Sequence, residues 1–205
     1  MTSSLNHPIV EQSFAIIDRE VGKHRLNSEE YAIARRVIHA TADFEYLQLL
    51  RFNHGAIEAG IAAIKAGVPI ITDVTMVKQG IRNLVSKTFN NPVIAAIELA
   101  QTAEPGKTRT ETGLLKCYSK YPGAIYVIGN APTALLALCD CIANSQTPPA
   151  LVIGVPVGFV SVVESKQALI ELNIPQIVIE GRKGGSPAAA SILNALLILA
   201  SPENN

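Results

Sequence analysis

The spacing of apolar residues predicts helices in the first third of the chain. The segments FAIIDREVG (14–22), LNSEEYAIARRVIHA (26–40) and AIEAGIAAIKAG (56–67) repeat apolar residues at helical spacing. Gly22 and Gly67 stand where glycines commonly end helices, and Asn27 or Ser28 is suited to cap the second helix. The β-branched segment VPIITDV (68–74) then predicts a short buried strand.

The second half of the chain alternates strand and helix patterns. Each of the strand patterns AIYVIGN (124–130), ALVIGVPVGF (150–159) and PQIVIEGRKGGS (175–186) is followed by a helical pattern of ten to fifteen residues. In the last unit, Ser186 is the expected N-cap and Pro187 the first helical residue. This alternation predicts βαβ units, and no linker divides residues 1–205. We therefore expect one three-layer α/β domain, with a mainly parallel sheet flanked by helices.

Composition and charge exclude several classes of protein. The chain has 205 residues, of which 48% are hydrophobic, so it can bury a sizeable core. Seventeen Lys and Arg residues balance seventeen Asp and Glu residues, which argues against a nucleic acid or an anionic membrane as partner. Cys139 and Cys141 match no common zinc spacing. No signal peptide or membrane span is recognisable, so we expect a cytoplasmic protein.

Polar and glycine residues follow the predicted parallel strands, where open α/β sheets bind their ligands. Glycines let a backbone approach a ligand closely, and helix N-termini offer free N–H groups to anions. The segment GRKGGS (181–186) adds two cations to these features. Together they predict a pocket for a large, negatively charged ligand. The residues expected at this edge are Thr72 and Asp73, then Gly129, Asn130 and Thr133, then 154–158 and 182–186.

Each of these features also has a purely structural interpretation. A single strand–glycine–helix turn is more often a connection than a ligand site, and Arg109 in TRTETG fits a solvated helix start. GRKGGS lacks the spacing of a P-loop, and no GxGxxG follows a strand. His39 can share a helical face with Arg35, Arg36 and Asp43. On the residues alone, we favour a hydrogen-bonded structural role for this histidine over a metal ligand or a proton donor.

Seven segments taken together are far more specific than any one motif. They are SFAII (13–17), RRVIHA (35–40), DVTMV (73–77), KTRTETG (107–113), IGNAPTAL (128–135), VIGVPVGFVSVVESK (152–166) and GRKGGS (181–186). In this order they resemble the precorrin-8X methylmutase family, over about residues 8–198. The resemblance implies a homodimeric isomerase of cobalamin biosynthesis, acting on precorrin-8X or cobalt-precorrin-8. It would move a methyl group from carbon 11 to carbon 12 of the macrocycle, giving hydrogenobyrinate or cobyrinate.

The resemblance also implies roles for individual residues. His39 would give a proton to the macrocycle and take it back. No redox cofactor, methyl donor or protein-bound metal is implied, because the migrating methyl group is already on the substrate. Arginines suit the carboxylate rim of the substrate, and apolar residues suit its flat face. The expected substrate-binding residues are Ser13, Arg36, Thr72, Asp73, Met76, Thr108, Arg109, Asn130, Ala131, Pro132, Thr133, Phe159, Arg182, Gly184, Gly185 and Ser186.

Two other functions are compatible with parts of the sequence. A corrinoid carrier without catalytic activity would have the same pocket, but it would not require an acid at His39. A phosphate- or nucleotide-using α/β enzyme is supported by GRKGGS and Asp73, and is weakened by the missing nucleotide motifs. The resemblance implies no role for Asp43. The match at Arg35 is ambiguous beside Arg36, and we prefer Arg36 as the residue that contacts substrate because it lies three residues before His39.

Overall fold

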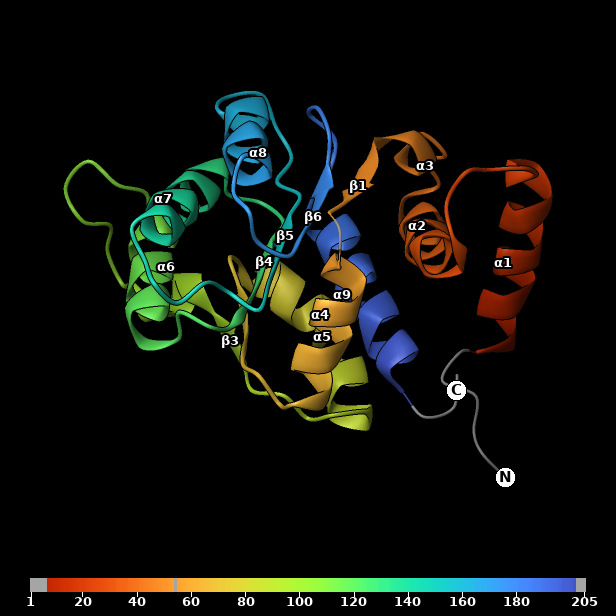
Figure 1. Cartoon of the computed structure of the whole chain (residues 1–205), viewed down its shortest axis with the longest axis horizontal. Helices are drawn as coiled ribbons and strands as arrows, with labels where there is room; N and C mark the ends of the chain where they lie inside the picture. The colour runs from red at the N-terminus through yellow and green to blue at the C-terminus, as the bar shows by residue number, and fades with distance from the viewer. Residues whose placement is uncertain (1–6, 54, 202–205) are drawn as a thin grey trace.

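A six-stranded sheet forms the centre of the computed structural model, which describes residues 7–53 and 55–201 (Figure 1). The spatial order of its strands is β1-β6-β5-β4-β2-β3. Strand β1 runs antiparallel to β6, and all other neighbouring pairs are parallel. The predicted α/β fold with a mainly parallel sheet is therefore confirmed. The strands are β1 (Leu50–Phe52), β2 (Ile70–Thr72), β3 (Val93–Ala95), β4 (Ile125–Ile128), β5 (Leu151–Gly154) and β6 (Gln176–Ile179).

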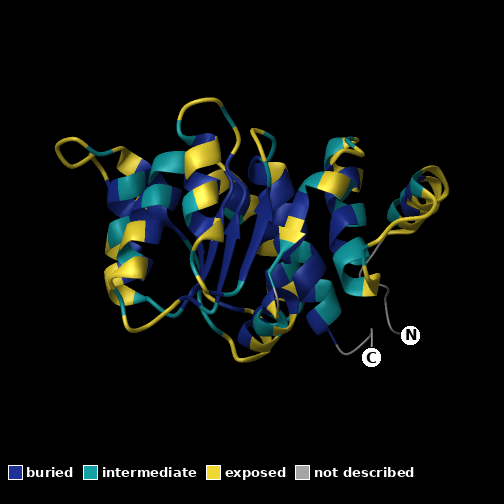
Figure 2. Ribbon diagram, turned by 45° about the horizontal axis from the view of Figure 1, so that its top comes forward, coloured by how far each residue is buried: buried dark blue, intermediate teal, exposed yellow. Residues whose placement is uncertain are grey.

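Helices cover both faces of this sheet, so the strands lie between two layers (Figure 2). The layer on one face comprises α4 (Ala56–Lys65), α5 (Thr75–Lys87) and α9 (Ser186–Ala200), with α2 (Ser28–Thr41) packed on α9 and α1 (Pro8–Val21) packed on α2. The layer on the other face comprises the 3₁₀ helix η1 (Ala96–Leu99), α6 (Arg109–Lys120), α7 (Pro132–Ala143) and α8 (Val162–Ile170). The short α3 (Tyr46–Leu49) leads into β1.

The central strands consist of consecutive apolar residues because both faces of the sheet are covered by helices. In β4, Ile125 and Val127 join the apolar cluster beneath α9, whereas Tyr126 and Ile128 join the cluster beneath α6 and α7. All four side chains are fully buried. Two separate cores therefore fix the sheet from both sides. In the described part of the chain, no helix is long and apolar enough to cross a membrane.

The helix ends confirm some of the capping predictions and correct one. Asn27 caps α2 in a reciprocal capping box with Glu30, and Gly22 ends α1 with a positive φ of 62°. The prediction of Ser186 as an N-cap is wrong: Gly185 caps α9, and Ser186 is the first helical residue. Gly185 takes a φ of 112°, which glycine tolerates and serine rarely adopts, so the cap falls on Gly185 and the helix begins one residue earlier than we expected, at Ser186 instead of Pro187.

Candidate functional site

The direction of the strand connections reverses between β2 and β4. The chain passes outward from β2 to β3, and then returns to β4 on the other side of β2 and continues through β5 to β6. Such a switch point opens a crevice at the carboxyl ends of the strands, where ligands bind in this class of fold. The segments that border this crevice are the β2–α5 and β4–α7 connections.

Asp73 connects the two segments that border the crevice, and it lies below the protein surface. One oxygen of the fully buried Asp73 carboxylate accepts hydrogen bonds from the backbone N–H groups of Asn130 at 2.6 Å and Ala131 at 2.8 Å. The other oxygen accepts one from Val74 at 2.9 Å. Burial raises the pKa of Asp73, and these hydrogen bonds oppose the rise. At α7, the anion that we expected from a ligand is therefore supplied by the protein itself.

The surface above Asp73 is formed by other side chains. Thr72 is fully buried, and its hydroxyl donates to the carbonyl oxygen of Val74 at 3.1 Å. By contrast Asn130 is exposed, and Met76 at the start of α5 is 67% exposed. The site therefore has Thr72 and Asp73 as its floor, and residues of the helix N-termini as its surface.

The N-termini of α6 and α7 meet at this surface. The hydroxyl oxygens of Thr108 and Thr133 lie 3.0 Å apart and share a hydrogen bond. Arg109 is exposed, and its guanidinium donates to the carbonyl oxygen of Ile97 at 3.3 Å. Pro132, between these groups in sequence order, is half-buried in the first turn of α7. The expected residues of these two motifs are thus adjacent in the fold.

The β5–α8 and β6–α9 loops are tied to each other along their backbones. Gly185 donates its N–H to the carbonyl oxygen of Val155 at 2.9 Å, and Gly158 donates to that of Arg182 at 3.3 Å. A Cβ atom on Gly184 would lie only 2.2 Å from the Val155 carbonyl oxygen. Phe159 is 83% exposed, and the Arg182 guanidinium lies 5.6 Å from the centre of its ring. An apolar surface and a cation are therefore presented side by side.

The C-terminal end of α2 lies beside the β6–α9 loop. Lys183 pairs with Asp43 at 2.5 Å and with Glu45 at 2.9 Å, and the Lys183 hydrogen bond lowers the pKa of Asp43. The Tyr46 hydroxyl donates to the carbonyl oxygen of Gly184 at 3.2 Å. These contacts bring the last turn of α2, which carries His39, towards the carboxyl ends of the strands. Asp43 thus contacts the β6–α9 loop.

His39 itself is exposed, so it is not a core residue. Its ring meets Phe14 of α1 edge-on, with 5.4 Å between ring centres. Ser13 is half-buried on α1, and its hydroxyl donates to the carbonyl oxygen of Ile9 in the same helix at 3.0 Å. The α1–α2 pair therefore positions the histidine by packing against one side of its ring and leaves the rest accessible.

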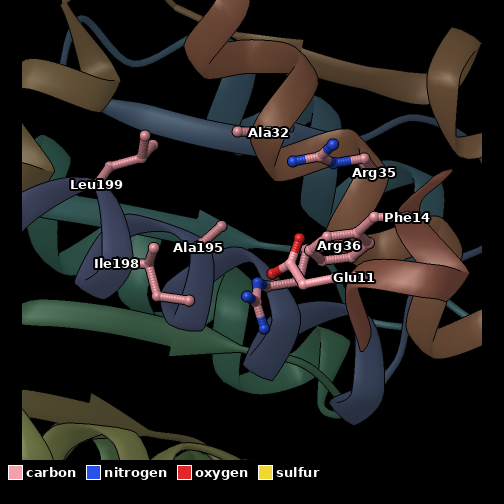
Figure 3. Close-up of a pocket in the computed structure, with 8 residues that line it drawn as sticks. All are labelled: Glu11, Phe14, Ala32, Arg35, Arg36, Ala195, Ile198 and Leu199. Carbon is pink, nitrogen blue, oxygen red and sulfur yellow. The ribbon is translucent and has the colours of Figure 1, made fainter. Parts of the chain in front are cut away.

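Arg36 points away from this end of the sheet. It lines a cavity of about 410 Å³ between α1, α2 and the C-terminal half of α9 (Figure 3). In Figure 3 the Glu11 carboxylate lies beside the Arg36 guanidinium. Burial and then the neighbouring Arg35 lower the pKa of Arg36, and Glu11 opposes them. Arg35 instead pairs with Asp18 at 2.9 Å. The structure therefore does not bring Arg36 together with the residues that follow the strands.

One residue that contacts the β6–α9 loop was not predicted from the sequence. Lys166 of α8 is only 2% exposed, and its ammonium group donates to the carbonyl oxygens of Gly181 and Lys183 in the β6–α9 loop. The signal was available, because Val162, Ser165, Lys166 and Leu169 follow the i, i+3, i+4, i+7 spacing of a buried helix face. A lysine on that face needs a polar partner in the interior.

The chain matches a known protein family over most of its length. The model of the precorrin-8X methylmutase family matches residues 8–199. The chain belongs to this family. It is 59% identical to the cobalt-precorrin-8 methylmutase of Synechocystis sp., over 96% of this chain and 97% of that protein. It is 38% identical to the precorrin-8X methylmutase of Pseudomonas aeruginosa, over 92% and 93%.

A solved structure is similar over almost the whole fold. The precorrin-8X methylmutase from Thermus thermophilus superposes with a TM-score of 0.85 and is 45% identical, covering 95% of this chain and 98% of that one. Methylmutases are isomerases, and these relatives are named for steps of cobalamin biosynthesis. The family, the enzyme class and the fold predicted from the seven motifs are therefore confirmed.

Proposed function

We propose that this chain moves a methyl group from carbon 11 to carbon 12 of cobalt-precorrin-8, giving cobyrinate. The observation that carries the proposal is the family match over residues 8–199, in a fold whose strand ends combine cations with an exposed apolar surface. The cobalt form is chosen because the 59% identical relative is named for it. Precorrin-8X, which would give hydrogenobyrinate, is the alternative substrate of the same site.

In this proposal His39 is the proton donor and acceptor. A proton given to the conjugated macrocycle withdraws electron density, which favours migration of the methyl group, and the proton then returns to His39. The reaction is therefore balanced without any other reactant. Two observations support the role: His39 is exposed, and it lies in the last turn of α2, where the helix dipole favours a positive charge.

The remaining residues are proposed to bind the rim and face of the substrate. Arg109 and Arg182 are exposed and can pair with its carboxylates, while Met76 and Phe159 offer apolar contact to the macrocycle. Thr108, Asn130, Ala131, Pro132, Thr133 and the segment 184–186 complete the surface, with Thr72 and Asp73 beneath it. Ser13 and Arg36 are also proposed to bind the substrate, after the α1–α2 pair adjusts around it.

We also propose that the chain is a single methylmutase domain that acts in the cytoplasm as a homodimer. The dimer is supported by the apolar side chains exposed near the strand ends, of which Phe159 and Val160 are each 83% exposed. Exposed apolar side chains gathered on one surface are typical of a surface that binds a ligand or another chain.

The test is an absorbance scan after mixing the protein with cobalt-precorrin-8 and, separately, with precorrin-8X. Methyl migration changes the conjugation of the macrocycle, so turnover produces a new spectrum. His39→Ala should slow turnover by about 10²–10⁴-fold, the usual contribution of general acid–base catalysis, and should still bind. His24→Ala is the control, because His24 is also exposed but stacks on Tyr31 with 4.0 Å between ring centres.

Two outcomes would contradict the proposal. Tight binding of both compounds without conversion by the wild-type protein would indicate a corrinoid carrier. Conversion by His39→Ala at the wild-type rate would remove the proton-transfer role of His39 and leave the isomerase activity in place.

A further inference from the structure

Lys166 is a buried cation bound only to backbone. Its Nζ atom donates to the carbonyl oxygens of Gly181 at 2.8 Å and Lys183 at 2.6 Å. Among residues 7–53 and 55–201, no carboxylate forms an ion pair with it. Burial lowers the pKa of Lys166 to about 8. Because burying an ammonium group without a counter-charge is costly, this side chain is not explained by stability.

The two acceptors of Lys166 belong to a loop whose successive carbonyl groups are all engaged. The carbonyl of Arg182, between them, accepts from the N–H of Gly158 at 3.3 Å. The next carbonyl, of Gly184, accepts from the Tyr46 hydroxyl at 3.2 Å. Three consecutive carbonyl groups, those of Gly181, Arg182 and Lys183, therefore bond to the segment 158–166.

The two cationic side chains of this loop have different surroundings. Lys183 is held by Asp43 and Glu45. Arg182 is exposed, and its guanidinium stands 5.6 Å from the centre of the Phe159 ring. Phe159 belongs to the loop that leads into α8, the helix that carries Lys166. Lys166 thus connects the segment that carries the cation to the segment that carries the ring.

We propose that Lys166 is a positioning residue for substrate binding, which holds the carbonyl groups of residues 181 and 183 so that Arg182 faces the carboxylate rim of the substrate above Phe159. The proposal rests on the proposed function, because it assigns Arg182 to the rim of a carboxylate-rich macrocycle. Loss of the Lys166 contacts should therefore displace Arg182 and weaken substrate binding. It should have little effect on the methyl migration step.

The first part of the test is kinetic. Lys166→Met keeps the length of the side chain and removes its donors. It should raise KM by about tenfold, the factor given by loss of one charge-assisted contact, with kcat unchanged. The double variant Lys166→Met/Arg182→Ala should have the KM of Arg182→Ala alone, because the two residues act as one unit. Gln167→Met, an exposed neighbour on α8, is the matched control.

The second part needs no substrate. Amide hydrogen exchange of residues 181–185 should become faster in Lys166→Met and stay unchanged in Gln167→Met. If Lys166→Met does not fold, Lys166→Gln takes its place, since it shortens the side chain but remains polar.

The outcomes separate the two proposals. If the wild-type protein converts neither compound, the proposed function fails, and hydrogen exchange still decides whether Lys166 orders the loop. If the wild-type protein is active but Lys166→Met has an unchanged KM or an unchanged exchange rate, the positioning role is overturned. A KM effect that multiplies with that of Arg182→Ala would also overturn it, because it would show that the two residues act independently.

Discussion

Replacing Gly184 with alanine tests the contact between the β5–α8 and β6–α9 loops. The new methyl group would lie 2.2 Å from the Val155 carbonyl oxygen and 2.9 Å from that of Pro156. Ordinary contact needs more than 3 Å, so the loops must separate, and the hydrogen bond from Gly185 to Val155 lengthens from 2.9 Å. Gly184 also has a φ of 150°, which residues with a Cβ atom rarely adopt.

These contributions set the expected magnitude. Overpacking costs about 1–3 kcal/mol, the strained backbone about 1–3 kcal/mol and the lost hydrogen bond about 0.5–1.5 kcal/mol. Since the half-buried loop at Gly184 can relax in part, we expect about 3 kcal/mol, near the lower end of the sum, which for a chain of this size lowers Tm by about 6–12 °C. Gly181→Ala is the control, because Gly181 has a φ of 72° but no atom within 4 Å of the added group.

The assay is thermal unfolding followed by calorimetry, with KM measured on the same samples. Gly181→Ala should cost about 1 kcal/mol, or about 2–4 °C, through its left-handed backbone alone. Gly184→Ala should also raise KM, because separation of the loops moves Arg182 away from Phe159. Equal losses of Tm in the two variants would refute the reasoning, since they would show that the close approach of Gly184 to Val155 contributes nothing.

Three further predictions concern charge and packing. The folded-state pKa of Lys166 lies near 8, below its usual 10.5, so wild-type stability relative to Lys166→Met should rise between pH 8 and 10.5, as followed by chemical denaturation. The Asp43 pKa is lowered mainly by Lys183, so wild-type protein should lose stability faster than Lys183→Met as pH falls below about 4. Gly113→Ala puts a methyl group 1.9 Å from the Ala96 carbonyl oxygen and should destabilise the fold by about 1–3 kcal/mol in calorimetry.

Local pattern predicted the parts of the fold that are buried on both faces. The strands β4 and β5 are continuous apolar runs, β6 is apolar after Gln176, and each of the three is followed by a helix with an apolar stripe. The strands β1 (Leu50–Phe52) and β3 (Val93–Ala95) were not predicted. Each has three residues and pairs at an edge of the sheet, so its extended conformation depends on the neighbouring strand more than on its own sequence. The helix α5 was also missed, because its buried stripe consists only of Val77, Ile81 and Val85.

The site was predicted as a group of residues, but not as a set of contacts. Topology alone places the residues that follow parallel strands at one edge, so grouping Asn130, Phe159 and Arg182 required only the order of elements. The partners of Asp73 and Lys183 could not be inferred in this way. Asp73 bonds to backbone 57 residues later, and Lys183 pairs with Asp43, 140 residues earlier. Such pairings depend on the packed fold, which no local pattern encodes.

The buried carboxylate of Asp73 has a consequence for selectivity. At the switch point of this fold, where other α/β proteins admit a small anion, two backbone donors already have a permanent internal partner. To bind there, free phosphate and nucleotides, which are abundant in cells, would have to displace the Asp73 carboxylate, which is part of the same chain. The surface above is left to ligands that are large enough to gain contacts across several loops at once. Discrimination against small metabolites is thus built into the interior of the protein.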